Sequence, residues 1–236
     1  MTFGSDLRFL RDGDSSWGPQ LARGVDVTRL PELSMIQPRP DPRLLNIWAD
    51  LRVFSREANE ATKTGIMMPQ EFFVKLKLSV PSRLVGLKEE FDPTSFPELL
   101  RLCMLAFMKG VFVQIPGYGP RMIYLVNGLE NALRAQLIRI SIPGSPSMGK
   151  LLFWALYVSA MSIFEDLDRN EWLWMALKRT MSALDLRSWA MTRTLLKRFL
   201  WIDMMYDPLG KHMYDQWLGG QSLLTQVEAL DSTEED

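Results

Sequence analysis

The chain has very few of the residues that build zinc sites and disulfides. Among its 236 residues, Cys103 is the one cysteine and His212 the one histidine. A structural zinc site normally takes four cysteine or histidine ligands, so the sequence excludes such a site, and it excludes any internal disulfide. Metal-ligand motifs, glycine-rich phosphate loops and nucleophile elbows are also missing, and we expect no metal and no cofactor.

The chain also has no surplus of positive charge. Its 27 basic and 28 acidic residues give a net charge of -1. Proteins that bind nucleic acid neutralise phosphates with an excess of lysine and arginine, so we expect no direct DNA binding. The lone cysteine and the lack of a basic-then-apolar start favour an intracellular location, either cytoplasmic or nuclear.

Long hydrophobic runs are missing as well. The longest apolar run covers residues 151–164, which is 14 residues, whereas a helix that crosses a bilayer needs about 20. We therefore expect no transmembrane segment and interpret this run as a central core helix. Hydrophobic residues make up 47% of the chain, which is enough for a substantial core.

The periodicity predicts an all-α fold, because no alternating strand pattern of useful length appears. We expect one compact multi-helix domain over residues 41–220. An irregular arm, rich in Gly, Pro, Asp and Arg, should precede it over residues 1–40 and be ordered only where it packs on the domain. An acidic tail over residues 221–236 should be disordered.

Capping residues set the expected helix boundaries. Asp41 and Pro42 should begin a helix that stops near Gly65, and Pro69 and Pro81 should each begin a short helical segment. Further helices are expected over residues 96–115, around residues 125–137, over residues 151–164, and over residues 169–184 after an Asp168/Glu171 capping box. Ser188 should cap a last helix with Trp189, Leu196, Phe199 and Asp203 on one side, interrupted by Pro208 and Gly210.

Several helical segments carry a recurrent order of aromatic and aliphatic residues. The clearest are Leu151-Leu152-Phe153-Trp154-Ala155-Leu156-Tyr157, Glu171-Trp172, Phe199-Leu200-Trp201-Ile202-Asp203 and Trp217, with weaker ones upstream from Asp41. Over roughly residues 41 to 217 this order resembles the fungal-specific transcription factor domain, the carboxy-terminal regulatory region of fungal zinc-cluster regulators. The six-cysteine DNA-binding module of that family cannot form from this chain. The resemblance implies a region that senses signals and contacts proteins, often in connection with secondary metabolism.

Two charged residues in apolar surroundings are candidate catalytic groups. Asp203 follows Phe199 by four residues and Leu196 by seven, which would place its carboxylate on an apolar helix face. Arg101 lies in the apolar sequence Leu99-Leu100-Arg101-Leu102. Because an unpaired buried charge is very costly, the two could form a structural ion pair with each other, or each could form a separate local salt bridge that fixes helix register. Alternatively, Arg101 could grip an anionic oxygen in a ligand pocket while Asp203 moves a proton.

Aromatic side chains are the candidates for a ligand-binding wall. Helical spacing is what core packing predicts, but Trp154, Trp172, Phe199 and Phe107 could also line a pocket for an apolar ligand.

Three functional hypotheses remain open on the sequence alone. The first is a stand-alone regulator-like module that binds an apolar small molecule or a protein partner, with a homodimer as a further option. The second is a repurposed cofactor-free enzyme, of the cyclase, lactonising or isomerase type, that acts on a polyketide-like intermediate. The third is a fragment, or an inhibitory partner, of a transcription regulator.

Overall fold

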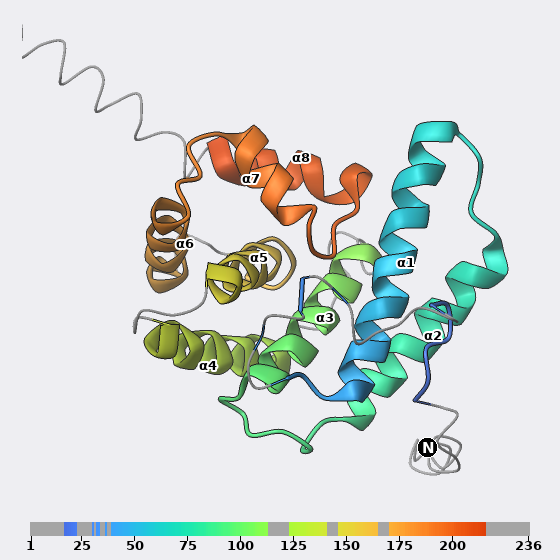
Figure 1. The fold of residues 1–236 in the computed structure, drawn as a ribbon, viewed down its shortest axis with the longest axis horizontal. Helices are drawn as coiled ribbons and strands as arrows, with labels where there is room; N and C mark the ends of the chain where they lie inside the picture. The colour runs from blue at the N-terminus through green and yellow to red at the C-terminus, as the bar shows by residue number, and fades with distance from the viewer. Residues whose placement is uncertain are drawn as a thin grey trace, which may run out of the picture.

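The described part of the chain is entirely helical, as predicted. The structure, a computed structural model, describes residues 17–22, 30, 32–33, 36, 39–112, 123–140, 146–164 and 170–215. Within them the chain forms eight α-helices and no strand (Figure 1). The predicted tail over residues 221–236 lies outside the described residues. The helices are α1 (Pro42–Thr64), α2 (Gln70–Gly86), α3 (Phe96–Phe112), α4 (Ile123–Ile140), α5 (Pro146–Ser162), α6 (Glu171–Ala183), α7 (Trp189–Leu196) and α8 (Asp203–Met213).

Helix α1 has the boundaries that its capping residues predict. The side chain of Asp41 accepts a hydrogen bond from the backbone N–H of Arg43 at 2.7 Å, and Pro42 occupies the first helical position. At the other end, Gly65 adopts a left-handed φ of 71° and donates its N–H to the carbonyl of Ala61 at 2.9 Å. Glycine reaches this conformation without the penalty that a β-carbon adds, so the helix ends there.

Helix α5 is the centre of the bundle. Every residue from 151 to 160 is buried, which confirms the predicted core helix. α3, α4, α6, α7 and α8 all pack on α5, whereas α1 and α2 pack on the other side of α3 (Figure 1). A helix that is apolar around its whole circumference has to be surrounded in this way.

Two prolines that were expected to bound helices lie inside them instead. Pro81 is within α2, which is one helix over residues 70–86, and Pro208 is within α8. A proline in a helix deprives the carbonyl four residues earlier of its N–H partner. Here those carbonyls belong to Lys77 and Met204, which are exposed, so water can replace the missing donor.

The predicted continuous helix after Ser188 is also wrong, although its cap is confirmed. Ser188 accepts a hydrogen bond from the N–H of Met191, but α7 ends at Leu196, and Asp203 begins α8. Tight i→i−3 bonds after Leu196 turn the chain away from the helix axis. α6 begins at Glu171 with Asn170 as its N-cap, and the expected cap, Asp168, lies outside the described residues.

Part of the N-terminal arm packs on α1 and α2 through one buried carboxylate. Asp50 of α1 is fully buried and accepts hydrogen bonds from the backbone N–H groups of Gln20, Leu21 and Ala22 at 2.7 to 3.0 Å. The guanidinium of Arg83 in α2 donates to the same carboxylate at 2.5 Å and to the carbonyl of Gly18 at 3.2 Å. The arm is therefore ordered where it meets this ion pair.

Candidate functional site

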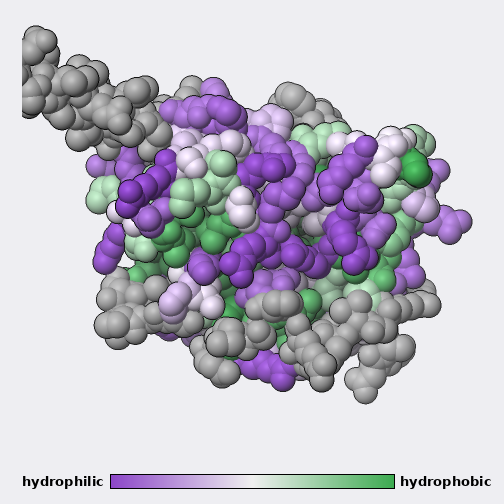
Figure 2. Space-filling view, turned by 45° about the horizontal axis from the view of Figure 1, so that its top comes forward, coloured by the Kyte–Doolittle hydropathy of each residue, from purple (hydrophilic) through white to green (hydrophobic). Residues whose placement is uncertain are grey.

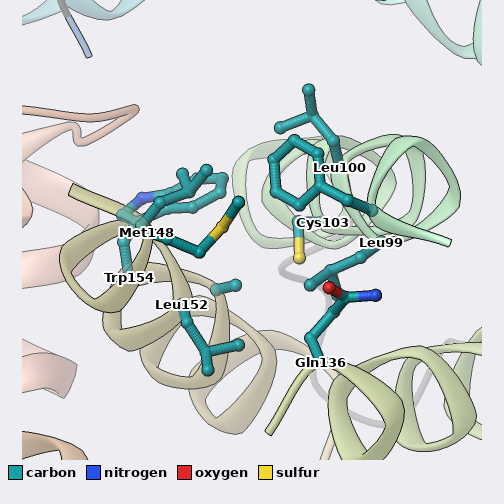
Figure 3. Close-up of a pocket in the computed structure, with 10 residues that line it drawn as sticks. Leu99, Leu100, Cys103, Gln136, Met148, Leu152 and Trp154 are labelled. Carbon is teal, nitrogen blue, oxygen red and sulfur yellow. The ribbon is translucent and has the colours of Figure 1, made fainter. Parts of the chain in front are cut away.

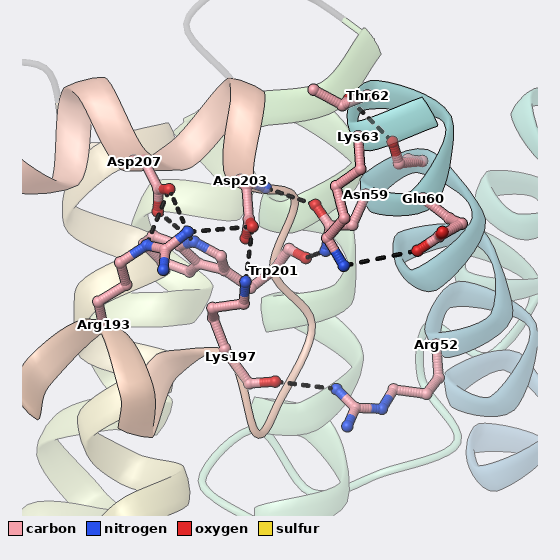
Figure 4. Close-up of polar contacts among 11 residues, drawn as sticks. Arg52, Asn59, Glu60, Thr62, Lys63, Arg193, Lys197, Trp201, Asp203 and Asp207 are labelled. Carbon is pink, nitrogen blue, oxygen red and sulfur yellow. Dashed lines mark hydrogen bonds and ion pairs between the residues drawn. The ribbon is translucent and has the colours of Figure 1, made fainter. Parts of the chain in front are cut away.

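Asp203 belongs to a polar cluster that joins α1, α7 and α8. Its Oδ2 atom accepts from Lys197 at 2.6 Å and pairs with Arg193 at 3.0 Å (Figure 4). Its backbone N–H donates to Asn59 of α1 at 2.7 Å, and Asn59 in turn donates to the carbonyl of Trp201 at 2.9 Å. The cluster fixes the corner between α7 and α8 against α1, which is a structural role.

The same cluster holds a second carboxylate. Asp207 accepts from Arg193 at 2.8 Å and from the indole N–H of Trp201 at 2.9 Å. Arg193 is therefore shared between two carboxylates, and together they raise the pKa of its guanidinium, chiefly through the hydrogen bond to Asp207. The Oδ1 atom of Asp203 is buried from solvent and has no hydrogen-bond partner among the described residues.

Arg101 pairs with a different carboxylate. Its side chain is buried and donates two hydrogen bonds of 2.7 Å to Glu98, one turn earlier in α3. It also donates to the carbonyl of Leu84 and to the hydroxyl of Tyr124, so it ties α3 to α2 and α4. Burial alone would lower the pKa of Arg101, but the bonds to Glu98 outweigh it and raise the pKa.

The two candidate catalytic residues thus have no partner in common. Asp203 is neutralised by Lys197 and Arg193, whereas Arg101 is neutralised by Glu98. The ion pair between Asp203 and Arg101 is not formed, and the other structural alternative, separate local salt bridges, is the one that the structure shows. A shared substrate site for both would require each to give up its own partner, which is costly for Arg101 because its pair with Glu98 is buried.

The four candidate ligand-binding aromatics pack on other side chains. Trp154 is buried edge-on against Trp48, and its indole N–H donates to the carbonyl of Leu200 at 2.9 Å. Phe199 packs on Trp154 at 5.9 Å between ring centroids, and Phe107 stacks on a tyrosine of α8. Trp172 is half-buried beneath the guanidinium of Arg134, which lies 4.4 Å from its ring centroid.

The enclosed space beside Trp154 is very small. Leu99, Leu100 and Cys103 of α3, Gln136 of α4, and Met148, Leu152 and Trp154 of α5 converge on it (Figure 3). Its volume is about 10 Å³. That is roughly room for one water molecule, so this cavity does not hold a metabolite.

A much larger cleft opens where α1 meets α2. It has a volume of about 440 Å³. Its walls are mostly apolar, with two carboxylates on the α1 side. Lining it are Val53, Glu57, Glu60, Ala61 and Thr64 of α1, the connection Ile66, Met67, Met68 and Pro69, and Phe72 of α2. Figure 2 shows hydrophobic side chains at the right of the face, over this connection and the beginning of α2, beside hydrophilic side chains of α1.

The sequence reasoning missed this cleft, although a signal was present. Ile66, Met67 and Met68 lie in a short connection between a helix-ending glycine and Pro69. Connections between helices are usually polar, so three large apolar residues in one are unusual. Met67 is 90% exposed and Ile66 is 71% exposed, which is the opposite of what their hydrophobicity favours.

A second groove lies on an adjoining face of α1, near the α7–α8 corner, and shares Val53 and Glu60 with the cleft. Its volume is about 420 Å³, and Arg52, Arg56, Lys63 and Lys197 line it together with Glu60. Each of these cations already has a partner. Arg52 donates to the carbonyls of Lys197 and Phe199, and the others pair with Glu57, Glu60 and Asp203, respectively. The groove therefore offers little uncompensated charge to an anion.

Two classes of site are not found in the described part of the chain. No group of three or more His, Cys, Asp or Glu side chains there could hold a metal ion. None of the helices over the described ranges is both long and apolar enough to cross a membrane.

Comparison with known proteins finds no matching family model, no matching curated protein and no matching solved structure. The resemblance to the fungal regulatory region therefore stays a prediction.

Proposed function

We propose that this chain is a regulator-like helical module that acts by binding a partner protein in the cleft between α1 and α2. The observation that carries the proposal is the exposure of large apolar side chains at that cleft. Met67 is 90% exposed beside a cleft of about 440 Å³, whereas three of the four candidate pocket aromatics are buried in the core and Trp172 packs against it. Exposed apolar groups of this kind mark surfaces that bury themselves against a partner.

The residues that line the cleft indicate which kind of partner would bind there. The apolar floor suits an amphipathic helix that inserts side chains at i, i+4 and i+7 spacing. Glu57 and Glu60 on the α1 wall have only exposed surface partners, Arg56 and Lys63, in pairs that contribute at most about 1 kcal/mol. Lysine or arginine of a partner can therefore take their place beside the apolar face. We therefore expect a partner helix with an apolar face and basic flanks.

An apolar small molecule fits the cleft less well. Pockets that hold small ligands usually bury 70% or more of the ligand surface. A wall as exposed as Met67 leaves one side of any such ligand in water. The enzymatic alternative required Asp203 and Arg101 to act on one substrate, and their separate partners weaken that argument. An intracellular location and a link to fungal secondary metabolism remain expectations that rest on the sequence.

The test uses chemical cross-linking in a cell extract, with peptides identified by mass spectrometry. The wild type is compared with Met67→Lys and with the matched control Met175→Lys, which alters an exposed methionine on α6. We expect a cross-linked helix with basic flanks that Met67→Lys removes and the control keeps. The corresponding synthetic peptide should bind more weakly as salt rises.

Two outcomes would contradict the proposal. In the first, an apolar compound is released from the purified protein on denaturation, and no cross-link depends on Met67. In the second, the cross-linked peptides are lost equally from Met67→Lys and from Met175→Lys, which would indicate nonspecific adhesion.

A further inference from the structure

The described chain begins on the same side of α1 and α2 as the cleft between them. The carbonyl of Trp17 accepts a hydrogen bond from Asn46 of α1 at 3.0 Å, and the Trp17 ring lies beside Gly86 of α2. With 3.6 residues per turn, helix positions 14 or 18 apart lie on one face. Asn46 and the cleft residue Thr64 are 18 apart in α1. Gly86 and the cleft residue Phe72 are 14 apart in α2.

The segment that precedes Trp17 has the pattern that this cleft requires. Residues 1–16 lie outside the described residues, but their sequence places Leu7 and Leu10 on one face of a helix. Phe3, four residues before Leu7, extends that apolar pattern. Arg11 lies beside the apolar face, and Arg8 lies one turn earlier on the same side. The segment therefore combines an apolar face with a basic flank.

The segment is also long enough to reach the cleft. The α1 wall runs from Val53 to Thr64, which lie 7 and 18 residues beyond Asn46. At 1.5 Å per residue these positions are about 10 and 27 Å along the helix axis. An extended connection over residues 12–16 spans at most about 17 Å, and a helix over residues 6–11 adds about 9 Å.

The connection has to turn the chain back towards the cleft. From Trp17 onward the described chain runs along α1 from Asn46 to Asp50, so the residues before Trp17 leave in the opposite direction. The connection, Asp12-Gly13-Asp14-Ser15-Ser16, consists only of residue types that favour turns. Gly13 can also end the helix, and Ser5 can cap its beginning.

We propose that residues 3–11 bind in the α1–α2 cleft of their own chain, with residues 6–11 as a short helix, and compete there with the partner protein. Because the segment would regulate access to the same cleft, this proposal rests on the proposed function. A helix this short is not stable alone, so it should form only on the cleft.

Charge supports this occupant. Arg8 and Arg11 are three residues apart, as are Glu57 and Glu60 on the α1 wall. Helix positions three apart lie one above the other, so the two arginines can face the two carboxylates when the helices lie side by side. The present partners of these carboxylates are exposed and can be displaced.

The acidic tail is excluded by the same charges. Residues 221–236 also carry apolar residues at helical spacing, Leu223, Val227 and Leu230. However, they hold five acidic and no basic side chains. Glu57 and Glu60 would repel such a segment, so the cleft selects the N-terminal segment over the tail.

The covalent connection makes weak binding sufficient. A short flexible linker gives an effective concentration in the millimolar range, so a segment with a Kd of about 1 mM would fill the cleft about half of the time. A partner binds only the open cleft, and its apparent affinity falls in proportion to the open fraction. We therefore expect the segment to weaken partner binding without abolishing it.

The experiment is disulfide trapping in the full chain. Cys103 is buried, so two introduced cysteines can be oxidised selectively. The test pair is Leu7→Cys with Met67→Cys. The matched control is Leu7→Cys with Leu78→Cys, which is also exposed and is nearer along α2 to Gly86 and Trp17 but does not line the cleft. We expect the intramolecular disulfide to form at least about tenfold faster in the test pair.

Charge reversal tests the contact itself. In the test pair, Arg8→Glu with Arg11→Glu should slow disulfide formation about fivefold, and adding Glu57→Lys with Glu60→Lys should restore it. Glu57 and Glu60 are exposed, so the melting temperature should stay close to that of the wild type and serves as the control for folding.

The trapped chain then tests competition. The partner cross-link of the proposed function should be lost when the disulfide is closed and return on reduction. Equal rates in the two cysteine pairs, a rate that charge reversal leaves unchanged, or a partner cross-link that persists with the disulfide closed would overturn the proposal. Fast closure of the test pair with no partner cross-link even after reduction would instead contradict the proposed function and support the segment as the occupant of the cleft.

Discussion

At the scale of single residues, buried ion pairs hold separate segments of this structure together. Asp50 and Arg83 are buried to 0% and 2% exposure, and Glu98 and Arg101 form a second buried pair. Each pair also satisfies backbone groups of another segment, which is how a buried charge becomes tolerable. These residues therefore connect segments and are poor candidates for chemistry, because a ligand would have to displace their partners.

Replacing Arg83 with methionine should be strongly destabilising. The variant leaves the carboxylate of Asp50 buried without its cation, and breaking such a pair costs roughly 3 to 5 kcal/mol. The three backbone N–H donors still stabilise the carboxylate, so the lower end of that range is expected. Urea unfolding followed by circular dichroism measures the change.

The matched control for this variant is Arg56→Met. Arg56 pairs with Glu57 on the surface with a side chain that is 74% exposed, and exposed pairs contribute at most about 1 kcal/mol. Equal losses in the two variants would show that the Asp50–Arg83 pair has no special role.

At the scale of helices, two glycines should respond in opposite ways to the same substitution. A β-carbon at Gly210 would lie 2.9 Å from a ring atom of Trp189 and 3.2 Å from one of Trp201, whereas at Gly149 the nearest atom is 3.9 Å away. Alanine favours helices over glycine by about 1 kcal/mol, so Gly149→Ala should stabilise the protein. Gly210→Ala should instead destabilise it by about 1 to 3 kcal/mol through overpacking.

Thermal unfolding of the two variants measures both effects. An increase in the melting temperature for Gly210→Ala would mean that α8 can move away from the two tryptophans without cost, contrary to the close packing around it.

Local signals predicted those elements whose boundaries depend on neighbouring residues. Asp41, Pro42 and Gly65 gave the limits of α1, and the apolar run gave α5, because caps and periodicity act over a few residues. The break between α7 and α8 depends on Asn59, which is more than 140 residues earlier in the chain. No local pattern contains that contact.

The candidate site was likewise predictable only in part from local sequence. The sequence identified Arg101 and Asp203 as charges that need partners, and both have them. It could not say which partners, because Glu98 and Lys197 compete with every other charge in the chain. The α1–α2 cleft depends on the angle between two helices, which tertiary packing sets.

At the scale of the whole molecule, the arm and the core should open independently. The N–H groups of Leu21 and Ala22 are bonded to one carboxylate, whereas the amides of α5 lie in a helix at the centre of the bundle. We expect the arm amides to exchange with deuterium faster than those of α5, because segments with few contacts open locally. Hydrogen exchange resolved by residue measures both rates.

Cys103 gives an independent measure of complete opening. Burial raises the pKa of its thiol, and the thiol is fully buried in α3, so a thiol reagent should label it only when the core opens. Labelling as fast as the exchange of the arm amides would contradict independent opening of the two parts.

The hydrogen bonds between the arm and Asp50 close a loop of 28 to 30 residues in a chain that cannot form an internal disulfide. A disulfide would restrain the unfolded chain as well, but these hydrogen bonds exist only in the folded chain, so the entropy of closing the loop is lost entirely on folding. Reducing agents do not break such a link. It depends on the charge of Asp50, so a change that removes that charge should release the arm, while the thiol chemistry of the cell leaves the arm in place.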